Sequence, residues 1–274
     1  MRAHPIGVIV FTAGVILVLF FGLPLLGSVV PSQTKQELSQ TTQPISITLT
    51  EPEPQEELPP PTEPLPPEPI YIVAAVEDDY FDDALFIGDS LTYGLQAYNI
   101  IPQASFVASI GVNISSIATD ELIDMPDGRS LSMLQAIAAQ SNPTKVYIMM
   151  GTNGINWLSV AGMIETYGHL VTYIRECFPE IIVYIQSILP TAYYIPDRQP
   201  GFNLTKMREY NQALKDLAIE KDAFFVDMYS FFADSYGYLP GEIAANDGIH
   251  IGSSSYQKWY EYLKEYAVVK VMPE

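Results

Sequence analysis

Five residues in four short segments of this 274-residue chain have the side chains needed for acyl transfer. Ser90, in the run Gly-Asp-Ser, is a weak nucleophile that needs a base, and the imidazole of His250 suits that role because it titrates near neutral pH. Asp247 lies three residues before His250 and can turn back to orient its second ring nitrogen. Gly111 and Asn153 bring a backbone N–H and a side-chain amide, which are donors that stabilise an oxyanion.

Each of these segments alone is weak evidence, because Gly-Asp-Ser, a single glycine and Asp-Gly all occur in ordinary turns and helix caps. Their positions give them weight, since each is expected at the end of a strand or in a loop. The other two histidines are poor alternatives. His4 precedes the apolar N-terminal segment, and His169 lies opposite the apolar stripe of its helix, where we expect a solvated surface residue. His250 is therefore the histidine left for catalysis.

The elements that must position these residues alternate along the chain. Five short apolar segments bounded by turn residues are predicted strands: Ala84–Gly88, Phe106–Ile110, Val146–Met150, Ile181–Ser187 and Phe224–Val226. Helical patterns are predicted at Ser130–Gln140, Leu158–Phe178, Lys206–Lys221 and Ser254–Val269. Apolar strands that alternate with helices predict a parallel sheet covered on both faces, an α/β sandwich. In such folds ligands bind at the carboxyl ends of the strands, where the first three polar segments fall.

With these residues the sequence resembles the SGNH, or GDSL, hydrolase family over about residues 80 to 270. The family's four blocks appear as Gly-Asp-Ser-Leu-Thr-Tyr-Gly at 88–94, Ser-Ile-Gly-Val-Asn at 109–113, Gly-Thr-Asn-Gly at 151–154 and Asp-Gly-Ile-His at 247–250. The resemblance implies a flavodoxin-like three-layer α/β/α fold with a five-stranded parallel sheet, and neither metal nor cofactor. It also implies a nucleophile, a base, its partner and two oxyanion donors at Ser90, His250, Asp247, Gly111 and Asn153. The third block commonly ends in Asp, whereas position 154 is Gly here.

The sequence before this region divides into two parts. Residues 6–30 carry no charged side chain and are long enough to span a bilayer, so residues 1–30 are predicted to be a cytoplasmic tip and a transmembrane anchor, with a cleaved signal peptide as the alternative. Arg2 places the N-terminus in the cytoplasm and the rest of the chain outside. Residues 31–69 hold half of the 22 prolines and many glutamates, which predicts a disordered, extended stalk. Residues 70–274 then form one domain.

The formal net charge of −19 argues against nucleic acid as a partner, because phosphate binding needs a basic surface. The single cysteine, Cys177, excludes an intramolecular disulfide.

Export on a stalk suggests an acylated glycan of the cell envelope or of the surroundings as the substrate, with acetyl as the expected acyl group. Aromatic side chains after the third and fourth strands are expected at the rim of the site, where they either stack on sugar rings or pack a surface lid: Trp157, Tyr193, Tyr194 and Phe202.

Three functions follow from these observations. The first is an extracytoplasmic serine esterase that works through an acyl-enzyme. The second is an O-acyltransferase with the same Ser-His-Asp core, which passes the acyl group to a sugar hydroxyl. Exclusion of water from the acyl-enzyme separates these two, and the sequence does not reveal it. The third is a non-catalytic binding module on a stalk, against which the intact Ser90, Asp247 and His250 speak.

Overall fold

The computed structural model describes residues 70–271, so the predicted anchor (1–30) and stalk (31–69) lie outside the described residues. None of the helices within 70–271 is long and apolar enough to cross a membrane. The centre of the fold is a five-stranded sheet in the order β3-β2-β6-β7-β8, in which every neighbouring pair is parallel. Its strands are β2 (Ala84–Gly88), β3 (Ser105–Ala108), β6 (Lys145–Met149), β7 (Ile182–Gln186) and β8 (Phe224–Val226). These are the five predicted strands, with ends that differ by no more than two residues.

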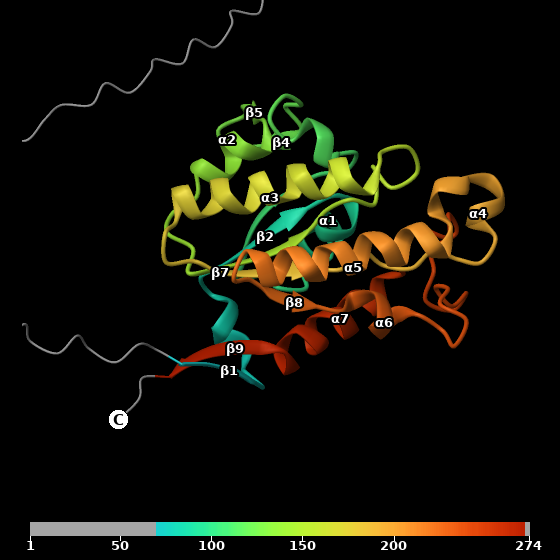
Figure 1. The fold of residues 1–274 in the computed structure, drawn as a ribbon. Coiled ribbons are helices and arrows are strands. Elements are labelled where there is room, and N and C mark those ends of the chain that lie inside the picture. The colour runs from blue at the N-terminus through green and yellow to red at the C-terminus, as the bar shows by residue number, and fades with distance from the viewer. Residues whose placement is uncertain (1–69, 272–274) are drawn as a thin grey trace, which may run out of the picture. The chain divides into compact units, whose positions relative to one another are not determined.

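Helices cover both faces of this sheet, which confirms the predicted three-layer α/β/α architecture. Alternate strand residues point to opposite faces, so Leu85 and Ile87 pack on one side, whereas Phe86 packs on the other. The first face is covered by α2 (Met133–Ala138), α3 (Val160–Cys177) and α5 (Leu204–Glu220), and Figure 1 shows α3 and α5 side by side over it. The second face is covered by α1 (Ser90–Ala97), α6 (Met228–Phe232) and α7 (Ser253–Glu265).

An aromatic ladder on the second face sets the register of all five strands. Each strand contributes one ring, and the five rings are direct cross-strand partners: Phe106, Phe86, Tyr147, Tyr184 and Phe224. The centroids of Tyr147 and Tyr184 are 4.2 Å apart with nearly parallel planes, and those of Phe86 and Tyr147 are 4.8 Å apart. Slipping one strand by one residue would turn its ring to the opposite face, so the ladder resists such a slip.

The first residues of α2 and α3 are set by local capping. Ser132 caps α2 with a reciprocal capping box to Gln135, and this explains why the helix begins at Met133 and not at the predicted Ser130. Ser159 accepts a hydrogen bond from the N–H of Gly162 and so begins α3. The predicted apolar stripe of α3 is buried against the sheet, and His169 is exposed on its outer face as predicted.

The predicted helix Ser254–Val269 is wrong at its C-terminal end. Helix α7 ends at Glu265, and β9 (Ala267–Val271) pairs antiparallel with β1 (Ile70–Ala74). The β-branched residues of β9 favour a strand, and pairing with a segment almost two hundred residues away decides the outcome. Smaller elements complete the described region: β4 (Ile123–Asp124), β5 (Ser130–Leu131), α4 (Ile195–Arg198), η1 (Asp78–Phe81), η2 (Ile114–Ser116) and η3 (Pro200–Phe202).

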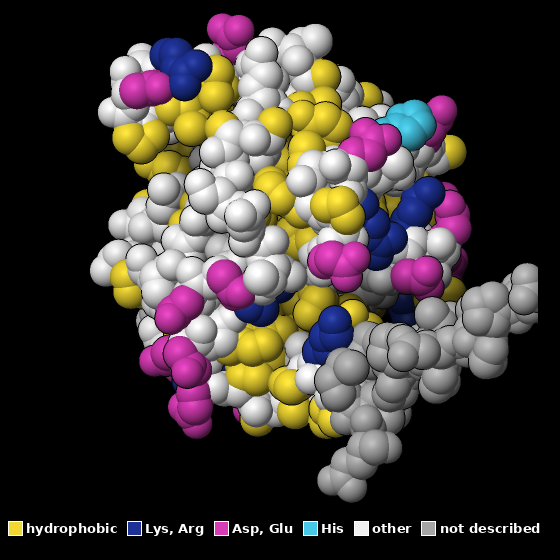
Figure 2. All heavy atoms as spheres, turned by 90° about the vertical axis from the view of Figure 1, so that its left-hand side faces the viewer, with side chains coloured by type: hydrophobic (Ala, Val, Ile, Leu, Met, Phe, Trp, Pro, Cys, Tyr) yellow, Lys and Arg dark blue, Asp and Glu magenta, His cyan; other side chains and the backbone are white. Residues whose placement is uncertain are grey.

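Figure 2 shows the face of the molecule at which α3 and α5 end. Lys and Arg side chains on this face are interspersed with Asp and Glu side chains. Positive side chains on this face therefore have negative side chains near them.

Three hydroxyl-mediated bonds tie the β1–β9 ribbon to the central sheet. The hydroxyl of Tyr184 accepts from the N–H of Val268 at 2.7 Å and bonds to the hydroxyl of Tyr80, which donates to the carbonyl of Val268.

We expect Tyr184→Phe to lower the free energy of unfolding by about 1–3 kcal/mol, because it keeps the ring of the ladder but leaves buried polar groups without a partner. Urea denaturation measures this change. Tyr193→Phe, at an exposed ring, is the matched control, and equal losses in both variants would contradict the assignment.

Candidate active site

Ser90 is the first residue of α1, directly after β2. Strand β2 is completely buried, and the Asp89 carboxylate caps the helix by accepting from the N–H of Leu91 at 3.1 Å. This turn places the Ser90 hydroxyl at the carboxyl edge of the sheet and half-exposed. The free N–H groups of the first helical turn point toward the same edge, where they favour negative charge.

The predicted base and its carboxylate complete a hydrogen-bonded chain with Ser90. Its Oγ lies 2.7 Å from Nε2 of His250, and Nδ1 of His250 lies 2.6 Å from Oδ2 of Asp247. The other carboxylate oxygen of Asp247 accepts from the backbone N–H groups of Ile249 and His250, both at 2.9 Å. Partial burial opposes ionisation of Asp247, but these backbone hydrogen bonds outweigh it and hold the pKa of the carboxyl below its usual value.

The loop between α6 and α7 carries His250, and we call it the histidine loop. It is attached to the segment after β7 and is closed by a pairing of its own residues. Gly248 adopts a left-handed backbone with φ +72°, and its carbonyl accepts from the N–H of Ala192 after β7. A side chain at position 248 would also collide with Tyr194. An isolated β-bridge pairs Ala244 with Ile251. These contacts hold the imidazole over Ser90 although 160 residues separate the two in sequence.

The two predicted oxyanion donors lie on the loops that flank the nucleophile. Gly111 follows β3 in a left-handed conformation with φ +84°, and an added Cβ there would meet only open space. Asn153 follows β6 and donates one amide hydrogen to the carbonyl of Val112 at 2.8 Å, which joins the two loops and leaves the second amide hydrogen free for a ligand. No hydrogen bond links either residue to the Ser90–His250–Asp247 chain in the described residues.

The rim aromatics divide into two groups. Phe202 is buried in the core, so it does not line the site. Trp157 and Tyr193 are 65% and 73% exposed, and the indole N–H of Trp157 donates to the carbonyl of Asn153. Trp157 is thus held beside a candidate oxyanion donor with its ring free in solvent.

A cavity of about 310 Å³ opens beside Ser90, and we call it the α1 groove. It is lined by Ser90, Tyr93, Gly94, Ala97, Tyr98, Ile110, Ala245, His250, Ile251 and Tyr256. The sequence analysis did not identify this groove. A signal for its first wall was present, because Ser90, Tyr93, Gly94 and Ala97 recur at the three- and four-residue spacing of a single helix face.

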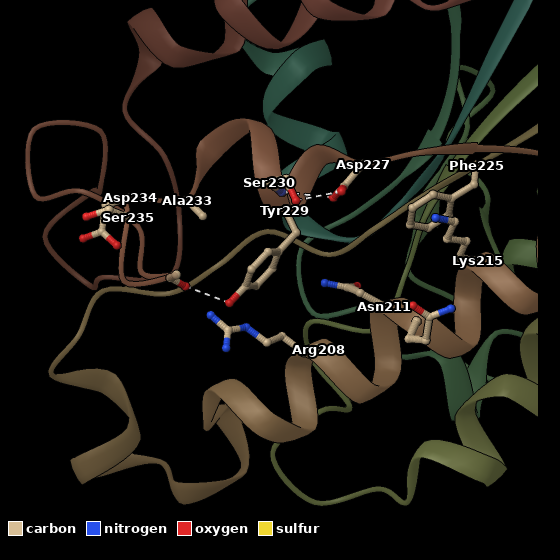
Figure 3. A pocket seen from close by; sticks show the side chains of 12 residues that line it. Arg208, Asn211, Lys215, Phe225, Asp227, Tyr229, Ser230, Ala233, Asp234 and Ser235 are labelled. Atoms are coloured by element: carbon tan, nitrogen blue, oxygen red, sulfur yellow. Dashed lines mark hydrogen bonds between the residues drawn. The ribbon is translucent and has the colours of Figure 1, made fainter.

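A more polar cavity of about 460 Å³ lies between α5 and α6 and shares no lining residue with the α1 groove. Figure 3 shows Arg208 and Lys215 along α5, opposite Asp227 and Ser230. Asp227 is occupied by the backbone and hydroxyl of Ser230, so it serves as the cap of α6. No cluster of three or more potential metal ligands occurs within residues 70–271.

Asp89 was missed as a special residue by the sequence analysis. Its side chain is fully buried, and Oδ2 has no hydrogen-bond partner among the described residues. Burial raises the pKa of Asp89 to about 6, against the opposing effect of the Leu91 N–H. A buried titratable group therefore lies next to Ser90 in the chain.

This pKa predicts a pH-dependent stability difference. Between about pH 4 and pH 6 the folded chain binds a proton at Asp89 that the unfolded chain releases, so stability falls as the pH rises through this window. Asp89→Asn keeps an oxygen for the Leu91 N–H and removes the buried charge. We expect it to stabilise the protein by up to about 3 kcal/mol more at pH 7.5 than at pH 4, relative to the wild type. Urea denaturation at both pH values measures this, and the exposed Asp79→Asn is the control. The same pH response in both variants would overturn the expectation.

Comparison with known proteins agrees with this geometry. Residues 86–258 match the family model described as the GDSL-like Lipase/Acylhydrolase family. A protein from Streptococcus pneumoniae, provisionally described as a platelet activating factor, is 23% identical with a TM-score of 0.55, covering 67% of this chain and 82% of its own. A GDSL-like lipase from Bacteroides thetaiotaomicron is 16% identical with a TM-score of 0.50, covering 67% and 84%.

At these identities the likeness to solved structures shows the fold alone, and it is the fold that the resemblance implied. None of the curated proteins matches the chain. The family model spans well over half of the sequence and includes Ser90, Asp247 and His250. The chain belongs to the GDSL-like lipase/acylhydrolase family.

Proposed function

We propose that this protein is a serine esterase in which Ser90 is the nucleophile, His250 the general base and Asp247 the residue that orients the imidazole. The observation that carries the proposal is the continuous chain of two short hydrogen bonds, 2.7 Å from Ser90 to His250 and 2.6 Å from His250 to Asp247. Both ring nitrogens are thereby engaged, which leaves Nε2 to accept the serine proton while Nδ1–H donates to the carboxylate.

The reaction then proceeds in two balanced halves. The Oγ of Ser90 attacks the ester carbonyl carbon while its proton passes to Nε2 of His250. When the carbon–oxygen bond to the alcohol breaks, the imidazolium returns that proton to the leaving oxygen, and an acyl-enzyme remains. Water then attacks the acyl carbon, gives its proton to His250, and the carboxylic acid leaves as the proton returns to Ser90. Asp247 stays ionised throughout, in keeping with its lowered pKa.

The oxyanion of each tetrahedral intermediate is stabilised by three donors in this proposal: the N–H of Ser90 in the first turn of α1, the N–H of Gly111 and the free amide hydrogen of Asn153. Their places at the ends of three adjacent strands support this role. At Gly154, where the family commonly has Asp, an added Cβ would come within 2.9 Å of the Leu158 side chain and 3.4 Å of that of Asn113, so a larger residue would need these side chains to shift.

We further propose that the esterase acts outside the cytoplasm, tethered by residues 1–30, and that its alcohol is a carbohydrate hydroxyl. The exposed rings of Trp157 and Tyr193 support the second point, because exposed aromatic faces beside a site can stack on sugar rings. Hydrolysis is favoured over transfer to a sugar because the His250 side chain is 37% exposed and Ser90 is only partly buried, so water reaches the acyl-enzyme.

The proposal is tested with the full-length protein and Ser90→Ala. We expect the wild type to hydrolyse an activated short-chain ester and to be labelled by a fluorophosphonate, and the variant to lose at least about 10³-fold in kcat/KM together with all labelling. Ser115→Ala, at an exposed serine of the short helix η2, is the control. An unlabelled wild type without esterase activity would refute the hydrolase function. A rate that rises mainly on addition of a sugar acceptor would instead establish the transferase.

The roles of the other two residues are separated by their kinetic losses. His250→Ala removes the proton carrier, whereas Asp247→Asn leaves the imidazole in place but poorly oriented, so we expect the Asp247 variant to lose about tenfold less in kcat than the His250 variant. Glu242→Gln, an exposed change in the same loop, serves as the control. Steady-state kinetics measure the three variants, and an equal or reversed order of losses would show that the roles are misassigned.

A further inference from the structure

The α1 groove begins at the nucleophile and runs along the helix that carries it. Ser90, Tyr93, Gly94 and Ala97 form one face of α1 and one wall of the groove. The opposite wall comes from the histidine loop and α7, through Ala245, His250, Ile251 and Tyr256. The cavity is therefore continuous with the catalytic chain, and a group attached to Ser90 lies at its mouth.

The lining of the α1 groove suits hydrocarbon. None of its residues carries a carboxylate, ammonium or guanidinium group, and His250 is the one histidine among them. Most of its surface is apolar, and Ile110, one of its lining residues, is 68% exposed. A sugar or a charged headgroup would lose its hydration here with few groups to replace it, whereas an alkyl chain gains free energy on leaving water.

The floor of the groove is preformed. Tyr256 lies over Gly94, where an added Cβ would come within 2.1 Å of the tyrosine oxygen, so only glycine leaves room for this ring. Tyr256 is 3% exposed and packs against Tyr98 and Trp259, with ring centroids 5.3 and 6.0 Å away. A ring fixed in this way gives the groove a defined depth and costs little ordering when a ligand enters.

The dimensions of the groove exceed those of an acetyl group. The distance from Ser90 to Ala97 along α1 is about 10 Å at about 1.5 Å per residue. An extended alkyl chain advances about 1.3 Å per carbon, given C–C bonds of about 1.5 Å. A chain of six to eight carbons therefore fits the length of the wall, while an acetyl group would leave most of the 310 Å³ cavity empty.

We propose that the α1 groove binds the acyl chain of the ester and selects acyl groups of about six to eight carbons; this inference rests on the proposed esterase function. The groove is lined from α1, the loop after β3, the histidine loop and α7, and by no residue of the loops that directly follow β6 and β7. The exposed Trp157 and Tyr193 follow β6 and β7, so that side remains for the alcohol. Under this proposal the acyl group is longer than the acetyl group expected from the sequence.

The first test is the chain-length profile of the full-length wild type on p-nitrophenyl acetate, butyrate, hexanoate, octanoate and laurate. We expect kcat/KM to rise at least tenfold from acetate to an optimum at hexanoate or octanoate and to fall for laurate. Complete burial of one methylene corresponds to about 0.8 kcal/mol, or about fourfold, so a tenfold rise requires burial of only part of the chain. A profile that is highest for acetate would overturn the proposal.

The second test narrows the groove. Ala97→Phe projects a ring into the far end of the wall, so the ratio of kcat/KM for octanoate to that for acetate should fall at least tenfold. Gln96→Phe adds the same ring to an exposed position of α1 that does not line the groove, and it should leave the ratio unchanged. Thermal denaturation of both variants verifies that they are folded, and a changed ratio in the control would remove the support from this test.

The remaining outcomes separate this inference from the proposed function. Acetate esters of hexanol and octanol present the chain on the alcohol side. If Ala97→Phe impairs these esters and not p-nitrophenyl octanoate, the groove binds the alcohol and the inference is wrong. If Ser90-dependent hydrolysis occurs but neither series responds to Ala97→Phe, the esterase stands without the acyl groove. If no ester is hydrolysed through Ser90, the proposed function itself fails.

Discussion

The alignment of the five parallel strands is the constraint on which the rest of the structure depends. One aromatic ring from each strand meets its neighbour in register, from Phe106 at one edge to Phe224 at the other. Parallel strands have no tight turn to set their register, so side-chain packing across the sheet must supply it. Because the strands are aligned, the loops after β2, β3 and β6 reach the same edge together.

That edge is completed by a segment from the far end of the chain. The histidine loop precedes α7, and α7 is held to the sheet by Trp259, whose indole N–H donates to the buried side chain of Gln186 at the end of β7. The imidazole is therefore positioned by the same sheet that positions Ser90. The Asp247 turn then adds a local constraint, because its backbone hydrogen bonds keep the carboxylate ionised and directed at His250.

Ser90 lies between two contrasting environments. On its N-terminal side Asp89 is buried with a raised pKa, so the turn that presents Ser90 contains a group that the fold tolerates at a cost. On its C-terminal side the α1 groove is apolar and preformed by Tyr256 over Gly94. In the proposed reaction the ester carbonyl would lie near hydrogen-bond donors, and the acyl chain would lie along the apolar groove. This contrast is what the proposed chain-length preference depends on.

The sequence by itself was enough for the five strands and for naming Ser90, His250 and Asp247 as candidates, because apolar runs and a spacing of three residues are local signals. It was not enough for the β1–β9 ribbon, since a strand in place of the last turn of a helix depends on a partner far away in sequence. Tertiary structure alone revealed the burial of Asp89 and Phe202 and the α1 groove. A helix face can be read from spacing, but whether it is packed or open depends on which distant residues cover it.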